Sequence, residues 1–134
     1  MSEIDALIFA NEAFYRAFAD KDIPGLNAIW AEDKSVSCIH PGWNALDDRE
    51  DIMQSFAQII GGPAPPQIEC HAPKATIHGD TGIVICYEAI GGEVLVATNI
   101  FVRGGSTWQM VHHHAGPASS LPLDPEESDP VSIN

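Results

Sequence analysis

The chain has 134 residues, of which 45% are hydrophobic and 19% are charged, and its formal net charge at pH 7 is −13. This length and composition predict one globular domain with a single core. Six Lys and Arg residues against nineteen Asp and Glu residues cannot easily supply the basic face that nucleic acid or an anionic membrane requires. No apolar run approaches the ~20 residues of a membrane span. The first residues lack the basic start of a secretory signal, so we expect none.

The first half of the chain predicts three helices. Apolar side chains recur every three or four residues over residues 4–20, at Ile4, Leu7, Ile8, Phe14, Ala17 and Phe18, whereas Asn11, Arg16 and Asp20 fall elsewhere on the helical wheel. A short second helix is expected to begin at Asp22, with Pro24 in its first turn. A third helix, over about residues 49–60, is capped by Asp47 or Asp48 and ended by Gly61-Gly62.

Residues 34–40 alternate in the manner of a strand, with Val36, Cys38 and His40 on one face. Pro41-Gly42 predicts a turn, and residues 43–46 predict a short returning strand. The three cysteines Cys38, Cys70 and Cys86 are an odd number without Cys-x-x-Cys spacing, which argues against a disulfide framework or a zinc knuckle. We expect reduced thiols in a cytoplasmic protein.

After a Gly/Pro linker at residues 61–66, four longer strands are predicted over residues 67–78, 82–90, 93–103 and 107–115. Glycine-containing turn signals separate them and favour antiparallel hairpins. Pro73 makes the first of these an edge strand or a bulged strand. Helices followed by an antiparallel sheet define an α+β domain with helices on one sheet face, here residues 1–117. Residues 118–134 are acidic and Pro-rich, and we expect a loose tail there.

Four segments carry recognisable motifs: His-Pro-Gly-Trp at 40–43 followed by Arg49 to Ile52, Gly79 to Gly82 leading to Glu88, Ala-Thr-Asn-Ile-Phe at 97–101, and Trp108 to Gly116. Together they resemble the nuclear transport factor 2-like superfamily, in its SnoaL-like branch. Asp48 departs from the family pattern, which usually has Gly there, so the turn before the third helix is expected to differ.

The resemblance implies a cone-shaped, strongly curved antiparallel sheet wrapped by three N-terminal helices, with a pocket at its open end. It also implies a homodimer through the convex sheet face, where Val96, Ile100 and Val111 form a surface too apolar to leave in water. Members of the family include isomerases, polyketide cyclases, dehydratases and non-catalytic assembly domains, so the fold alone does not select a function.

Strand alternation nominates the side chains that line the pocket. The predicted catalytic residues are Glu88 as general base or as the partner of the base, His112 or His114 as proton shuttle, and Asn99 as donor to a substrate carbonyl. The predicted substrate-binding residues are Trp30, His40, Trp43, Cys86, Phe101, Trp108 and Met110. The implied chemistry is that of a cofactor-free isomerase, cyclase or dehydratase acting on a small molecule.

Other interpretations stay open. Glu88 and Asn99 equally fit buried polar groups that only satisfy one another, and three adjacent histidines fit a solvated strand end. His40, His112, His114 and Glu88 are also compatible with a metal site, but His-x-His on a strand is far less diagnostic than a helical His-Glu-x-x-His, and we expect no metal. The alternative function is a non-catalytic ligand-binding or assembly module.

Overall fold

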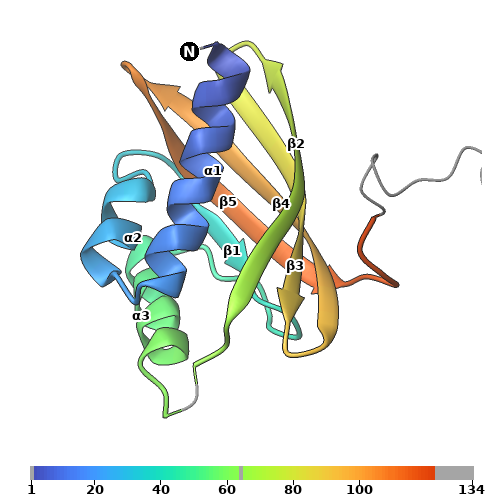
Figure 1. Ribbon diagram of the computed structural model, residues 1–134. Coiled ribbons are helices and arrows are strands. Elements are labelled where there is room, and N and C mark those ends of the chain that lie inside the picture. Colours follow the sequence, from blue (N-terminus) through green and yellow to red (C-terminus); the bar gives the residue numbers. More distant parts are fainter. Residues whose placement is uncertain (1, 64, 123–134) are drawn as a thin grey trace, which may run out of the picture.

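The computed structural model describes residues 2–63 and 65–122. Three helices and five strands follow one another in this part of the chain: α1 (Glu3–Ala19), α2 (Ile23–Ile29), β1 (Ser37–Ile39), α3 (Arg49–Ile60), β2 (Ile68–His78), β3 (Thr81–Ile90), β4 (Glu93–Gly104) and β5 (Thr107–Pro117). The strands form one curved sheet and the helices lie on one side of it (Figure 1). The predicted α+β class is confirmed, and residues 123–134 of the predicted tail lie outside the described residues.

Short acidic and hydroxyl side chains set the starts of the helices. Ser2 accepts a hydrogen bond from the Asp5 amide and its own amide donates to the Asp5 carboxylate, which is a capping box. Asp22 caps α2, and Asp48 caps α3 by accepting from the Asp51 amide. Asp48 has a φ of −118°, so the position where the family pattern has Gly needs no left-handed backbone here.

The sheet order is β1-β5-β4-β3-β2. The three predicted hairpins are confirmed, since β2–β3, β3–β4 and β4–β5 all pair antiparallel. The interruption at Pro73 is also confirmed, because β2 is an edge strand whose register shifts between His71 and Lys74. β1 pairs parallel with β5, placing Cys38 opposite His113. The returning strand predicted at 43–46 is reduced to one bridge between Cys38 and Leu46.

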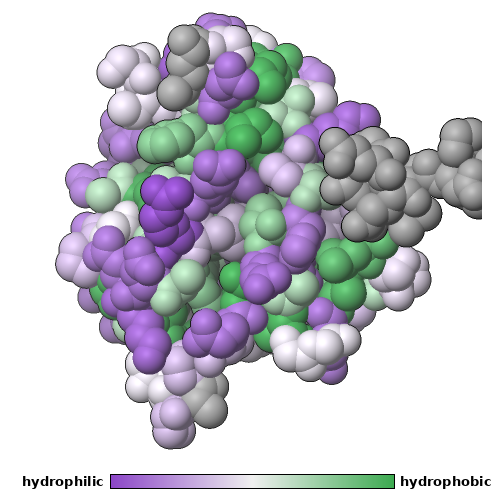
Figure 2. All heavy atoms as spheres, viewed as in Figure 1, coloured by the Kyte–Doolittle hydropathy of each residue, from purple (hydrophilic) through white to green (hydrophobic). Residues whose placement is uncertain are grey.

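The core lies between the helices and the concave face of the sheet. Its largest fully buried side chains include Trp30, Phe14, Phe56 and Phe101. The helical wheel of α1 is rotated from the predicted one, because Asn11 is fully buried and Ile4 is 42% exposed. The outward side of the helices is largely hydrophilic, with apolar patches between (Figure 2). Over residues 2–63 and 65–122, every helix is too short or too polar to cross a bilayer.

Candidate functional site

A β-bulge in β5 determines which histidine faces the interior. Ile100 of β4 pairs with His112, whereas the next residue, Phe101, pairs with Met110. Val111 is therefore an extra residue on β5 with no partner of its own. Side chains alternate along a strand, so one extra residue shifts the alternation. The next inward-facing residue after Met110 is therefore three positions later instead of two.

The inward-facing imidazole is therefore that of His113, which is 5% exposed. The prediction that His112 and His114 face the pocket is wrong, and the bulge is the physical reason. His114 is exposed, and His112 is half-buried with its Nδ1 2.6 Å from the Ser37 hydroxyl oxygen. Both lie on the side of the sheet away from the helices.

Beside His113 lies a cavity of about 220 Å³ between α1, α3 and the concave sheet face. Its polar side chains are Tyr15, His40, Glu88 and His113. Most of the remaining wall is apolar, and it includes Phe14, Phe18, Trp43, Phe56, Ile68 and Leu95. An apolar wall with a few convergent polar groups is the usual composition of a small-molecule site.

The His-Pro-Gly-Trp motif forms a tight turn at this cavity. The Trp43 amide donates to the His40 carbonyl oxygen at 2.9 Å, and Gly42 has a φ of +82°. Pro at the second position and a left-handed Gly at the third are typical of a type II turn. The turn brings the Trp43 ring back against the His40 ring, with 4.9 Å between centroids. Trp43 lines the cavity and is 43% exposed, so it lies on the solvent side of it.

Three buried hydrogen bonds connect Glu88 to His113 through α1 and β4, and a fourth joins this network to Asn11. The Tyr15 hydroxyl donates to Glu88 Oε2 at 2.6 Å, and Asn99 Nδ2 donates to the Tyr15 oxygen at 3.1 Å. Asn99 Nδ2 also donates to Asn11 Oδ1 at 2.8 Å. Asn99 Oδ1 lies 2.5 Å from His113 Nδ1. Asn99 is thus the centre of the network and is itself fully buried beneath the cavity.

Burial changes the proton affinities of the two ionisable groups at the end of this network. Burial raises the pKa of Glu88, and the hydrogen bond from Tyr15 opposes part of that rise. Burial, helped by the neighbouring imidazoles, lowers the pKa of His113 from 6.5 to about 3. His113 is therefore neutral near pH 7, with its Nε2 3.9 Å from Glu88 Oε2.

His40 occupies the other polar edge of the cavity. Its ring centroid is 6.4 Å from that of His113, and it packs against Phe56 at 4.9 Å. Its Nε2 lies 2.8 Å from the hydroxyl oxygen of Ser55 on α3. Burial lowers the pKa of His40 to about 4, so this imidazole is also neutral near pH 7.

The structure separates the predicted substrate-binding residues into three groups. His40 and Trp43 line the cavity beside Glu88. A second group is fully buried in the core and does not line it, namely Trp30, Cys86, Phe101 and Met110. For the three strand residues of that group, Cys86, Phe101 and Met110, the predicted inward direction is right. The prediction that the four residues line the pocket is wrong, because they are fully buried in the core. Trp108 lines a different hollow, on the outer surface.

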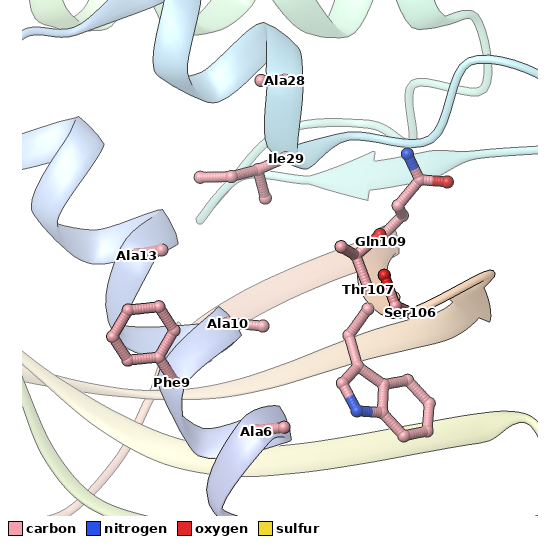
Figure 3. A pocket seen from close by; sticks show the side chains of 10 residues that line it. Ala6, Phe9, Ala10, Ala13, Ala28, Ile29, Ser106, Thr107 and Gln109 are labelled. Atoms are coloured by element: carbon pink, nitrogen blue, oxygen red, sulfur yellow. The ribbon is translucent and has the colours of Figure 1, made fainter. Parts of the chain in front are cut away.

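That second hollow is a surface groove between α1, α2 and the start of β5 (Figure 3). Small side chains on α1, including Ala6, Ala10 and Ala13, form one wall, and Ile29 and Gln109 lie across from them. Of the described residues that line this groove, none carries an ionisable side chain. The groove therefore lacks the acid–base groups that the inner cavity has.

Sequence reasoning missed four residues of the site: Asn11, Tyr15, Ser55 and His113. Asn11 and Tyr15 had a detectable signal, since they stand four and eight residues after buried Leu7 and share its side of α1. Ser55 stands three residues after buried Ile52 and shares its side of α3, which is the same kind of signal. His113 had no such signal, because alternation without the bulge places it outside.

The metal set considered from the sequence does not come together. His112 and His114 lie on one side of the sheet, whereas His40 and Glu88 lie on the other. Within the described ranges 2–63 and 65–122, no three His, Cys, Asp or Glu side chains are grouped to hold a metal ion.

Comparisons with known proteins agree with this architecture. Residues 8–120 match the model of the SnoaL-like domain family. A provisionally assigned dehydratase of the nuclear transport factor 2-like family from Streptomyces avermitilis superposes with a TM-score of 0.79, at 30% identity, over 88% of this chain and 97% of the other. A provisionally assigned calcium/calmodulin-dependent protein kinase type II association domain from Thiobacillus denitrificans superposes with a TM-score of 0.70, at 31% identity, over 82% and 93%.

Among curated proteins, the F-box protein SKIP8 of Arabidopsis thaliana is 24% identical over 112 residues, which are 82% of this chain and 48% of that protein. The chain thus spans about half the length of this relative. The fold and the cavity define a cone-shaped α+β domain with a partly polar interior hollow. The chain belongs to the SnoaL-like domain family of the nuclear transport factor 2-like superfamily.

Proposed function

We propose that the inner cavity binds a small molecule and that Glu88 exchanges a proton with it beside the neutral imidazole of His113, as in a cofactor-free isomerase, cyclase or dehydratase. One observation carries the proposal: a buried carboxyl and a neutral imidazole, with Glu88 Oε2 3.9 Å from His113 Nε2, line the same apolar cavity. The raised pKa of Glu88 supports it, because a carboxylate with a raised pKa is a stronger base than an ordinary one and can both accept and return a proton.

The proposed step is proton transfer at a carbon next to a carbonyl group. Ionised Glu88 removes the proton, the C–H electron pair forms an enolate, and protonated Glu88 returns the proton to another carbon or to a departing hydroxyl, which leaves as water. The Tyr15 hydroxyl stabilises the carboxylate through its bond to Oε2. Asn99 is a positioning residue here, because it is buried behind Tyr15 and His113. The 30% identity to the Streptomyces avermitilis protein is compatible with this reaction class.

Hydrogen exchange into simple ketones tests the proposal without knowledge of the natural substrate. Cyclohexanone and 2-tetralone are incubated in D2O with the protein, and loss of the proton signal beside the carbonyl is followed by NMR. We expect protein-dependent exchange that Glu88→Gln abolishes. Glu69→Gln is the matched control, since that side chain is 78% exposed on the neighbouring strand. Equal exchange by the wild type and Glu88→Gln, or none with a ketone that binds, would refute acid–base catalysis.

A second candidate function is a non-catalytic assembly module, favoured by the 31% identity to the kinase association domain from Thiobacillus denitrificans. In the described part of the chain, no helix covers the convex sheet face, where Ile85 is 44% exposed and Val96, Ile100 and Val111 are half-buried. We propose a homodimer through this face, because apolar surface of this kind is usually covered.

Light scattering after size exclusion tests the dimer. Ile85→Lys should shift a micromolar sample toward the monomer, because the dimer would bury its charge. Ile4→Lys is the matched control, since Ile4 is equally exposed but lies on α1, away from the convex face. A monomeric wild type would contradict the proposed dimer.

A further inference from the structure

We infer that the inner cavity selects an uncharged ring compound bearing a hydroxyl group. The reason is that Ser55 fixes the tautomer of His40 and Asn99 fixes that of His113, so that each imidazole presents an unprotonated nitrogen to the cavity as a hydrogen-bond acceptor. The inference rests on the proposed function only in that the cavity is a binding site. It adds the chemical class of the ligand and two residues that determine it.

The tautomer of His40 follows from the single proton of Ser55. The Ser55 oxygen lies 2.6 Å from the Ile52 carbonyl oxygen, and a carbonyl only accepts, so the hydroxyl proton of Ser55 is used there. His40 Nε2, 2.8 Å from the same Ser55 oxygen, must then be the donor. A neutral imidazole carries one proton, so Nδ1 of His40 keeps its lone pair.

That lone pair is open to the cavity. Within residues 2–63 and 65–122, Nδ1 of His40 has no hydrogen-bond partner. In the same ranges, Nε1 of Trp30 is the only side-chain nitrogen or oxygen that is both buried and without a partner, so Nδ1 of His40 is not buried. Nδ1 is therefore accessible, and His40 lines the cavity. An accessible acceptor of this kind needs a donor from a ligand or from water.

The tautomer of His113 follows in the same way from Asn99. The amide nitrogen of Asn99 donates to Asn11 Oδ1 and to Tyr15, so its oxygen is the atom that faces His113 Nδ1. Nδ1 is therefore the donor, and Nε2 of His113 keeps its lone pair. With Glu88 beside it, the polar end of the cavity offers two imidazole acceptors and a carboxyl group.

The absence of a cationic side chain among the described residues that line the cavity, together with the carboxyl of Glu88, excludes an anionic ligand. None of the described residues lining this cavity is Lys or Arg, and Glu88 would repel a carboxylate. An anion would lose its hydration in this cavity without gaining a cation, which is a large cost. The chain's net charge of −13 acts in the same direction at longer range.

The cavity has room for a ligand of one or two rings. The cavity volume of about 220 Å³ exceeds the ~150 Å³ of an apolar cavity that takes up benzene. The imidazole centroids are 6.4 Å apart at one end, so a hydroxyl on the ring edge reaches either acceptor while the ring contacts Phe14, Phe56 and Leu95.

Three matched probes test the inference by calorimetry near pH 7: 2-naphthol, 2-methoxynaphthalene and 2-naphthoate. They share one ring system and differ in carrying a donor, no donor or a negative charge. We expect 2-naphthol to bind about tenfold more tightly than the methyl ether, the worth of one hydrogen bond, and 2-naphthoate not to bind. Similar binding of 2-naphthol and the ether overturns the inference but leaves the binding site standing. Binding of none of the three overturns the proposed function as well.

Nitrogen-15 NMR of the histidine side chains tests the tautomers directly. We expect His40 protonated on Nε2 and His113 on Nδ1, and 2-naphthol should shift the signals of the two unprotonated nitrogens. Ser55→Ala should release His40 to the other tautomer and reduce the preference for 2-naphthol over its ether, whereas Ser35→Ala, at an exposed position, should change neither. A wild-type His40 protonated on Nδ1 overturns the inference even if Ser55→Ala does not fold.

Discussion

Acid is expected to destabilise the domain through His40. Burial lowers the pKa of this imidazole to about 4 in the folded state, against 6.5 in the unfolded chain. Between these values the unfolded state binds more protons, so the free energy of unfolding falls as the pH decreases. Each tenfold difference in proton affinity corresponds to ~1.36 kcal/mol. His40 alone should therefore remove about 3 kcal/mol between pH 7 and pH 4, a large part of the ~5–15 kcal/mol of an ordinary domain.

Urea unfolding of the wild type and His40→Gln across this pH range measures the effect. The difference between the two free energies of unfolding isolates His40, since His113 and Glu88 titrate in both proteins. His113 has a lowered pKa and acts in the same direction, whereas Glu88 has a raised pKa and acts in the opposite one.

We expect the wild type to lose about 3 kcal/mol more than His40→Gln on going to pH 4, by the same proton-affinity argument. His78→Gln, at an exposed end of β2, controls for the loss of one imidazole. A difference between wild type and His40→Gln that does not change with pH would refute the reasoning, because it would mean that His40 binds its proton equally in both states.

Three further predictions concern the hydrogen-bond network, the packing of β3 against α1 and the start of α3. Tyr15→Phe removes the donor to Glu88 and should cost ~1–3 kcal/mol in denaturant unfolding; it should also raise the pKa of Glu88 further, as carbon-13 NMR of the carboxyl would show, and an unchanged pKa would contradict the bond. Gly82→Ala would place a Cβ 2.6 Å from a methyl carbon of buried Leu7, so we expect ~1–3 kcal/mol of destabilisation, and a neutral change would mean that Leu7 moves aside freely. Asp48→Ala should lower the free energy of unfolding by ~1 kcal/mol through loss of the cap on α3. Asp48→Ser should keep most of this stability, because the Ser hydroxyl can also accept the capping hydrogen bond.

Local patterns in the sequence were sufficient for the helices and the hairpins, although not for the returning strand at 43–46 or the bulge in β5. The helix starts at Asp22 and Asp48, the three hairpins and the interrupted edge strand at Pro73 all follow from caps, turn glycines and proline. These signals depend on a few neighbouring residues, so they can be read without knowledge of the rest of the chain. For the same reason the alternation placed Glu88 and Asn99 correctly on the concave face.

The assembly of the network needed the tertiary structure. Glu88 is bonded to Tyr15 from α1, 73 positions away, and His40 is bonded to Ser55 from α3. The parallel pairing of β1 with β5 likewise joins segments 75 positions apart. Contacts over such separations are set by how the helices pack on the sheet, which no short window of sequence contains.

The identity of the inward histidine is the clearest case. A strand of uniform alternation presents His112 and His114 together, and that much followed from the sequence. In the tertiary structure His113 faces inward instead, because Val111 forms a bulge in β5 while β4 and β5 stay paired on both sides of it. A bulge is retained when the side chains beyond it pack better in the shifted register. Here the His113 ring centroid lies 5.0 Å from that of Phe14, and His113 Nδ1 lies 2.5 Å from Asn99 Oδ1. Those partners come from α1 and β4, so residues remote in the chain determine which histidine faces inward.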